Sequence, residues 1–313
     1  MADKKLPDNW QERVGAPATP ALSARAREAW VGWAFISPVM LGILAFQVVP
    51  IIISLLTSFT DWDGLTPAAF VGLSNYFRVT VDPQFAQTLS NTVQFTIWAV
   101  PLTVGVALVL ALLLESSKLR GRAFFRTVFF TPYITSAVAI GLVWTQFYAP
   151  DGTLNGLLGV FGVKGPNWLT SLHFAMPAVI AVAVWQGMGY PMVILLAGLQ
   201  GIPRPLYEAA ELDGASPWRK FWSITLPLLT PHLFFVMITQ FITSFQIFAI
   251  IYVMTRGGPG NGTNVLIYYL YQHAFTFGHV GYASAVAWLL FLMIGAVTIL
   301  QWQLQKRWVF YDQ

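Results

Sequence analysis

The chain has 313 residues, of which 56% are hydrophobic and only 10% are charged, and its mean hydropathy is +0.63. Soluble domains carry roughly 25% charged residues, so most of this chain's surface cannot face water, and an integral membrane protein is predicted. The absence of cysteine excludes disulfides and thiolate metal sites. A net charge of +4 and a pI of about 9.3 would suit nucleic acid, but the basic residues alternate with apolar runs and indicate membrane orientation instead.

The N-terminal part is predicted to be a polar tail followed by one long span. Residues 1–29 lack a sustained apolar period and are expected to form a cytoplasmic tail. The first span lies at about 30–59, and no charged residue occurs from 29 to 60, which exceeds the roughly 20 residues that a span requires. A cleaved signal peptide is not expected, because its apolar core would be shorter and begin sooner. Pro38 and Pro50 are expected to bend the helix.

Five further apolar runs follow, so we predict an all-α integral membrane protein with six transmembrane helices. The additional spans lie at about residues 91–114, 127–147, 174–199, 228–255 and 282–303. A short aromatic helix is expected at 265–277, on or in the outer face. The predicted organisation is a tail at 1–29, the first helix with an outer segment at 30–87, a core of five helices at 88–303, and a cytoplasmic tail at 304–313.

The distribution of Lys and Arg predicts the side that each loop faces, because cytoplasmic loops carry an excess of both. Only Arg78, Lys164 and Arg256 lie on the predicted outer side. The other basic residues lie on the predicted inner side, and they are Lys4, Lys5, Arg13, Arg25, Arg27, Lys118, Arg120, Arg122, Arg126, Arg204, Arg219, Lys220, Lys306 and Arg307. Both termini are therefore predicted to be cytoplasmic.

The loop between the fourth and fifth predicted spans has a specific pattern. Residues 204–227 read R-P-L-Y-E-A-A-E-L-D-G-A-S-P-W-R-K-F-W-S-I-T-L-P. This predicts a short helix that ends at Gly214, in the left-handed conformation, and a second short helix that begins at Ser216. Ala209 and Ala210 give the first helix a face of small side chains, which another protein's surface could approach closely. The loop is therefore predicted to fit into a cleft of another protein.

The spacing E-A-A, three residues, G, nine residues, I-x-L-P resembles the EAA loop of importer-type ABC permeases. In that family, the resemblance implies, the loop docks into a separate ATPase subunit and transmits nucleotide-driven motion to the membrane helices. The residues that the resemblance assigns to this coupling loop are Glu208, Ala209, Ala210, Asp213, Gly214, Ala215, Ile224, Leu226 and Pro227. The alternative is a helix–Gly–helix loop that merely connects two spans.

Further segments resemble carbohydrate-type ABC permeases. They are F-V-G-L-S-N-Y at 70–76, T-R-G-G-P-G-N-G-T at 255–263, Y-L-Y-Q-H-A-F at 269–275 and G-Y-A-S-A at 281–285. The likeness covers about residues 37–307 and is similar to the first-subunit kind of maltose, multiple-sugar and glycerol-3-phosphate permeases. It implies a type I importer permease fold with cytoplasmic coupling helices.

The resemblance also implies partners and a location. The expected partners are a second homologous permease chain, two ATPase subunits that bind ATP and magnesium, an extracytoplasmic solute-binding protein, a sugar and the lipid membrane. No cofactor is expected on this chain, and no nucleic acid is expected as a partner. The implied location is a bacterial or archaeal inner membrane, with both termini in the cytoplasm.

The predicted spans contain no Asp, Glu, Lys or Arg. Because ion-coupled carriers commonly place ionisable side chains at mid-membrane, the driving energy is expected to enter from outside the bilayer. No G-x-x-x-x-G-K-[ST] loop occurs, so any nucleotide must bind another chain. No histidines have the i, i+4 spacing of a helical metal site, and no nucleophile is paired with a base. We therefore expect no metal site, no catalytic residue and no enzyme activity on this chain alone.

Polar residues within the fourth and fifth spans are the candidate substrate path. Gln186 and Tyr190 are one helical turn apart, and Gly187 lets a ligand approach the backbone. Gln240 and Ser244 are likewise one turn apart. Amides, hydroxyls and an aromatic ring suit the hydroxyls and C–H faces of a sugar, although such residues also hydrogen bond between helices. That alternative is favoured for Gln94, Gln146 and Gln246.

Other functional classes stay open at this point. An importer of glycerol-3-phosphate or another polar solute would use the same architecture, although no intramembrane Arg or Lys is present to pair with a phosphate. A secondary sugar carrier or facilitator would need no ATPase. A receptor or scaffold would bind the ATPase without moving solute.

Overall fold

The computed structural model describes residues 22–116 and 119–310. Its regular elements within these ranges are helices, and the only strand-like feature there is an isolated β-bridge between Thr60 and Phe70. Most of the predicted N-terminal tail, together with Lys118 and residues 311–313, lies outside the described residues. The chain divides into two compact units, Met1–Leu56 and Thr57–Gln313, and each is described by itself.

The first unit contains one long apolar helical segment, in agreement with the predicted first span. It consists of α1 (Leu22–Ile43), a π-helical turn η2 (Leu44–Val48) and most of α2 (Val49–Thr57). Pro38 lies inside α1, whereas Pro50 is the second residue of α2 and follows the end of the π-helical turn by two residues. Proline removes a hydrogen bond and clashes with the carbonyl four residues earlier, so a locally widened turn before Pro50 is the expected adjustment.

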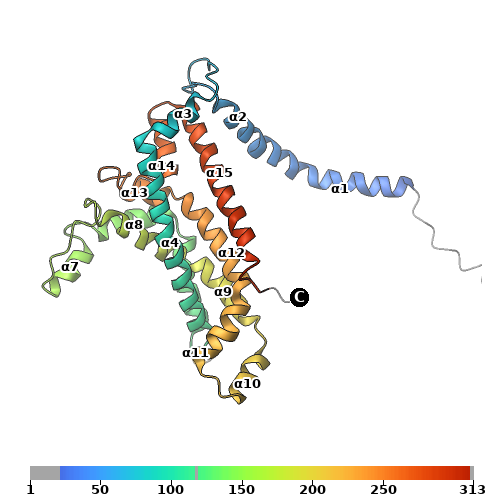
Figure 1. Ribbon diagram of the computed structural model, residues 1–313, viewed down its shortest axis with the longest axis vertical. Coiled ribbons are helices and arrows are strands. Elements are labelled where there is room, and N and C mark those ends of the chain that lie inside the picture. Colours follow the sequence, from blue (N-terminus) through green and yellow to red (C-terminus); the bar gives the residue numbers. More distant parts are fainter. Residues whose placement is uncertain (1–21, 117–118, 311–313) are drawn as a thin grey trace, which may run out of the picture. The chain divides into compact units, whose positions relative to one another are not determined.

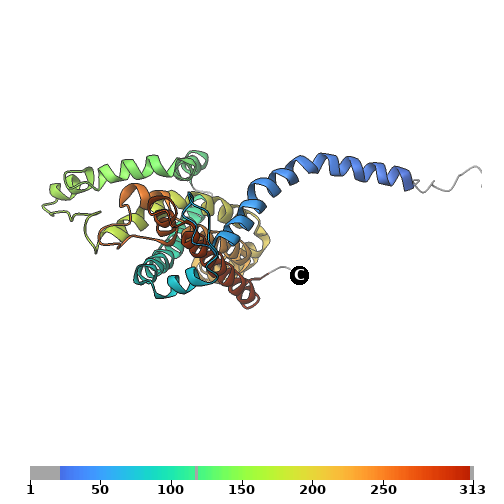
Figure 2. The same ribbon diagram turned by 90° about the horizontal axis from the view of Figure 1, so that it is seen from above.

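The second unit is a bundle organised around the 33-residue helix α4, which packs against α8, α9 and α12 (Figure 1). Its helices are α3 (Ser74–Val81), α4 (Pro83–Glu115), α5 (Arg122–Ile134), α6 (Ala137–Phe147), α7 (Thr153–Val160), α8 (Ala175–Gly187), α9 (Gly189–Gln200), α10 (Arg204–Leu212), α11 (Pro217–Lys220), η3 (Phe221–Thr225), α12 (Leu226–Phe245), α13 (Ala249–Met254), α14 (Leu266–Tyr271), η4 (Gln272–Thr276) and α15 (Val280–Gln305). Within this unit, α10 and α11 lie at the end opposite α3 and α14 (Figure 1). The green helices α6 and α7 extend along one side (Figure 2).

The described residues hold four helices that are long and apolar enough to cross a membrane, and two bent helix pairs raise the number to six. The bent pairs are α5 with α6, at 97°, and α8 with α9, at 46°. Six spans were predicted, and six result when each bent pair is one span. The third and fourth of these spans are each broken near the middle.

Non-helical backbone angles mark one break, and a proline accounts for the other. Thr135 and Ser136 have non-helical backbone angles between α5 and α6. At Met188, α8 gives way to α9, because Pro191 has no N–H to bond to the Gly187 carbonyl oxygen. A Cβ atom at Gly189 would lie 2.8 Å from the carbonyl oxygen of Phe129, so only glycine lets α9 approach α5 this closely.

The aromatic helix predicted at 265–277 exists as α14 and η4, and it is packed into the bundle rather than lying on its surface. Tyr269 is fully buried. Its hydroxyl donates to the Asp82 carboxylate at 2.7 Å, and the Tyr282 hydroxyl donates to the same oxygen at 3.0 Å. The other Asp82 oxygen caps α4 by accepting the Gln84 N–H at 2.8 Å. Asp82 thus joins the beginning of α4 to α14 and α15.

The environment of this carboxylate accounts for its ionisation. Burial acts to raise the pKa of Asp82, but hydrogen bonds from Tyr269, the Gln84 N–H and Tyr282 together outweigh burial and hold the pKa below its ordinary value. Beside them, burial and the nearby His279 lower the pKa of His273 to about 4. His273 is therefore a neutral ring at pH 7, and it packs against both tyrosines.

We predict that Asp82→Ala destabilises the protein by about 2–4 kcal/mol, because it removes a helix cap and leaves two buried hydroxyls without their charged acceptor. The measurement is denaturant unfolding in detergent micelles at pH 7. The depressed pKa means that the carboxylate contributes fully above about pH 4 and that its contribution is lost at lower pH. Asp82→Asn, which keeps an acceptor oxygen, should lose less than Asp82→Ala. An alanine variant within about 0.5 kcal/mol of the wild type would contradict this assignment.

Candidate functional site

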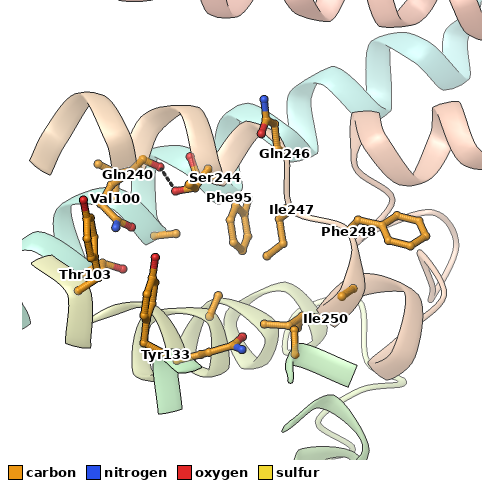
Figure 3. A pocket seen from close by; sticks show the side chains of 18 of the residues that line it. Phe95, Val100, Thr103, Tyr133, Gln240, Ser244, Gln246, Ile247, Phe248 and Ile250 are labelled. Atoms are coloured by element: carbon orange, nitrogen blue, oxygen red, sulfur yellow. Dashed lines mark hydrogen bonds between the residues drawn. The ribbon is translucent and has the colours of Figure 1, made fainter. Parts of the chain in front are cut away.

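A cavity of about 480 Å³ lies midway along the bundle, between two hydrophobic core clusters (Figure 3). On α4, Phe95 and Ala99 belong to one cluster, Ala107 and Ala111 belong to the other, and Thr103 between them lines the cavity. The opposite walls come from α5, α8, α9 and α12, and from the break between α12 and α13. The cavity therefore lies where packing of the apolar core is interrupted.

All five residues of the candidate substrate path line this one cavity: Gln186, Gly187, Tyr190, Gln240 and Ser244. The Gly187 position faces α4 and α12, since a Cβ atom there would lie 3.7 Å from Thr103 and 4.0 Å from the Gln240 amide oxygen. Of the three residues for which interhelical hydrogen bonding was favoured, Gln246 also lines the cavity. Its side chain is exposed.

One wall of the cavity consists of two tyrosine rings and the side-chain amide of Gln186. Tyr133 and Tyr190 stack with ring centroids 5.4 Å apart and planes inclined by 17°. The side-chain amide of Gln186 donates one hydrogen bond to the Thr135 carbonyl oxygen at 3.3 Å, across the break between α5 and α6. Figure 3 shows Tyr133 pointing across the cavity toward the wall that carries Gln240. The break at Thr135 therefore helps to place both an amide and a ring beside the cavity.

The α12 wall carries four polar residues on two adjacent turns. Thr239 and Thr243 line the cavity together with Gln240 and Ser244. Ser244 is buried and its hydroxyl is also hydrogen bonded to the Thr96 hydroxyl at 3.1 Å, so it joins α12 to α4 as well as facing the cavity. Both interpretations of Ser244, cavity lining and interhelical hydrogen bonding, thus describe real contacts.

Sequence reasoning missed several lining residues, including Tyr133, Thr103, Thr239, Thr243 and Phe248. A usable signal existed for Thr239 and Thr243, because they repeat the one-turn spacing of Gln240 and Ser244. No comparable signal existed for Tyr133 or Phe248, which reach the cavity only because α5 and α12 end where they do.

The coupling loop folds as its sequence predicts. Gly214 has φ +71°, and its N–H donates to the Glu211 carbonyl oxygen at 3.0 Å while the Ala215 N–H donates to that of Ala210 at 2.9 Å. This pair of bonds is the Schellman termination of a helix. The Ser216 hydroxyl then caps α11 by accepting the Arg219 N–H at 3.3 Å.

The loop is exposed at its beginning and anchored at its end. Glu208, Ala209 and Asp213 are exposed, and Leu212 is 91% exposed although it is apolar. In contrast, the last part of the motif, with Ile224 and Leu226, packs against the core cluster that contains Ala107 and Ala111, which we call the inner core cluster. Pro227 at the start of α12 is half-buried.

Two contacts hold α10 to the helical segment that follows it, one to α11 and one to η3. Lys220 forms an ion pair with Glu211 at 2.7 Å, which is worth little by itself at an exposed position. The Tyr207 and Thr225 hydroxyls are hydrogen bonded at 2.8 Å. Among the described residues, no group of three or more His, Cys, Asp or Glu side chains could hold a metal ion.

Known proteins resemble this chain over nearly all of its length. The family model described as binding-protein-dependent transport system inner membrane component matches residues 85–309. The probable ABC transporter permease protein YesP of Bacillus subtilis (strain 168) is 37% identical over 303 residues, which cover 95% of this chain and 97% of that protein. The lactose transport system permease protein LacF of Rhizobium radiobacter is 37% identical over 275 residues, which cover 86% and 92%.

The fold also resembles a solved structure. A chain of a bacterial ABC transporter involved in the import of the acidic polysaccharide alginate superimposes with a TM-score of 0.77 at 20% identity. The match covers 90% of this chain and 96% of that one. At this identity the likeness concerns the fold alone.

We predict that Gly214→Val loosens the coupling loop, because a β-branched residue at φ +71° costs about 1–2 kcal/mol. Hydrogen exchange of the Ala215 amide should then be about tenfold faster. Gly214→Asn is the matched control, since asparagine tolerates this conformation, and its exchange should stay near the wild-type rate. Equal exchange in the valine and asparagine variants would show that the positive φ does not matter.

Proposed function

This chain belongs to the family of binding-protein-dependent transport system inner membrane components and is a membrane-spanning permease subunit, and we propose that its cargo is a carbohydrate. The observation that carries the proposal is the cavity between the two core clusters, whose lining combines amides, hydroxyls and aromatic rings. Sugars present hydroxyl groups that donate and accept, and C–H faces that pack on aromatic rings. The lactose, multiple sugar-binding and arabinooligosaccharide permeases among the relatives support the same cargo class.

The polar groups of the cavity are suited to weak and reversible binding. A transported ligand must leave the site again, so no single contact can dominate. Gln186 and Gln240 offer neutral hydrogen-bonding groups from opposite walls, and Tyr133 with Tyr190 offers an aromatic surface. Binding pockets for small polar ligands commonly combine apolar lining with a few placed polar groups.

We also propose that ATP hydrolysis occurs on a separate ATPase subunit that binds the α10–α11 loop. The absence of a phosphate-binding loop from the sequence and the exposure of Glu208, Ala209 and Leu212 support this assignment. The small side chains permit close approach of a partner's surface, and Leu212 offers an apolar contact. Motion of the loop would pass directly into α12, which carries one wall of the cavity.

The complete transporter, in this proposal, contains a second homologous permease chain, two ATPase subunits and an extracytoplasmic solute-binding protein. The two α10–α11 loops approach each other when ATP closes the ATPase dimer, the spans open outward, and hydrolysis restores the inward-open state. The asymmetry of Lys and Arg supports placing this loop and both termini in the cytoplasm. The membrane is accordingly a bacterial or archaeal inner membrane.

Simultaneous Gln186→Leu and Gln240→Leu replacement should reduce ATP-driven sugar uptake by at least about tenfold, because two neutral hydrogen-bonding groups leave the cavity and each is worth about 1 kcal/mol. The measurement is uptake of radiolabelled sugar by proteoliposomes that contain the complete transporter. Gln94→Leu is the matched control, since Gln94 is exposed and does not line the cavity. Equal uptake by the double variant and the control would show that the cavity does not lie on the transport path.

A further inference from the structure

The hydroxyl groups on the α12 wall of the cavity donate hydrogen bonds to the backbone of their own helix. Thr239, Thr243 and Ser244 donate to backbone carbonyl oxygens of α12, at 3.0–3.1 Å. A carbonyl oxygen can only accept, and a hydroxyl has one proton, so a hydroxyl that donates to its own helix has no second proton for a ligand. These hydroxyl oxygens can therefore accept a hydrogen bond from a ligand, but they have no proton left to donate to it.

The lining also lacks a counter-ion for an anion. No Asp, Glu, Lys, Arg or His is among the described residues that line the cavity. The spans around it are equally neutral, since residues 83–114, 127–150, 165–203 and 221–255 contain no Asp, Glu, Lys or Arg. A carboxylate or phosphate that leaves water without a cationic partner loses several kcal/mol of solvation. Lone pairs facing it would add repulsion.

A neutral hydroxyl fits this lining better than an anion does. Each sugar hydroxyl donates to one group and accepts from another, so it can give its proton to Thr239, Thr243 or Ser244. It can accept from the amides of Gln186 and Gln240, which both donate and accept. The Gln186 amide retains one free N–H beside the one given to Thr135.

We propose that this cavity selects uncharged saccharides and excludes anionic ones, namely uronic acids and sugar phosphates. The inference rests on the proposed function as a carbohydrate permease and narrows its substrate class. The acidic polysaccharide named for the fold neighbour is therefore a poor guide to the cargo of this chain.

Saturation-transfer NMR on the membrane complex, without the solute-binding protein, tests this selectivity at the cavity itself. The probes are neutral mono- and disaccharides, including lactose, maltose and arabinobiose, and the uronic acid and phosphate analogues of those that bind. We expect anionic analogues to bind at least about tenfold more weakly than their neutral counterparts. An anionic analogue that binds within about threefold of its neutral counterpart overturns the inference and leaves the carbohydrate assignment intact. Binding of no saccharide, charged or neutral, counts against the proposed function itself.

Two substitutions at one position locate the selectivity. Gln240→Arg supplies a permanent cation and should raise the affinity for the uronic acid analogue by about tenfold or more. Gln240→Met, of similar length and uncharged, should weaken neutral sugars without admitting the anion. Thr243→Arg is the second charged variant in case the first fails to assemble. Should no assembled arginine variant bind the uronic acid more tightly than the wild type does, the selectivity does not reside in this cavity.

Discussion

A continuous helical segment, Pro217–Phe245, connects the exposed loop to one wall of the cavity. The rise of 1.5 Å per residue places Gln240 roughly 35 Å from Pro217 along this segment. The loop end is fixed to the rest of the bundle by Ile224 and Leu226 in the inner core cluster. The elements α11, η3 and α12 follow one another without an irregular residue between the loop and the polar face of α12.

A second feature of the bundle is that its membrane spans carry no charged side chains. Polar groups in a membrane must be satisfied within the protein, and here threonine and serine hydroxyls donate to their own helix backbone along α5 and α12. Charged residues gather instead at the ends, as at Asp82 and in the α10–α11 loop. Residues 83–114, 127–150, 165–203 and 221–255 contain no Asp, Glu, Lys or Arg, the side chains that ion-coupled carriers commonly place at mid-membrane.

The sequence predicts much of this architecture because the relevant signals are local. Apolar length places the six spans, the EAA spacing places the coupling loop, and the one-turn spacing of Gln240 with Ser244 places two side chains on one face of α12. Pro191 gives a local signal for the break at Met188, because it cannot donate a hydrogen bond to the Gly187 carbonyl oxygen. The break at Thr135 has no comparable signal, and the close contact of Gly189 with the Phe129 carbonyl depends on tertiary packing.

These local sequence signals do not predict contacts between distant parts of the chain. Asp82 binds Tyr269 and Tyr282, which follow it by 187 and 200 residues. His273 and His279 also meet, with their Nδ1 atoms 3.4 Å apart, although their spacing fits no single helical face. The cavity lining likewise depends on where α5 and α12 end, so only the part carried by regular helical periodicity could be foreseen.

The most direct test of energy transfer through the loop is sugar accumulation against a gradient in proteoliposomes. The complete transporter with ATP should accumulate sugar, whereas this chain alone should not. Glu208→Lys, which reverses a charge on the exposed face of α10, should abolish accumulation although the protein still inserts into the membrane. Uphill transport by the isolated chain, or wild-type accumulation by the assembled Glu208→Lys transporter, would contradict the account.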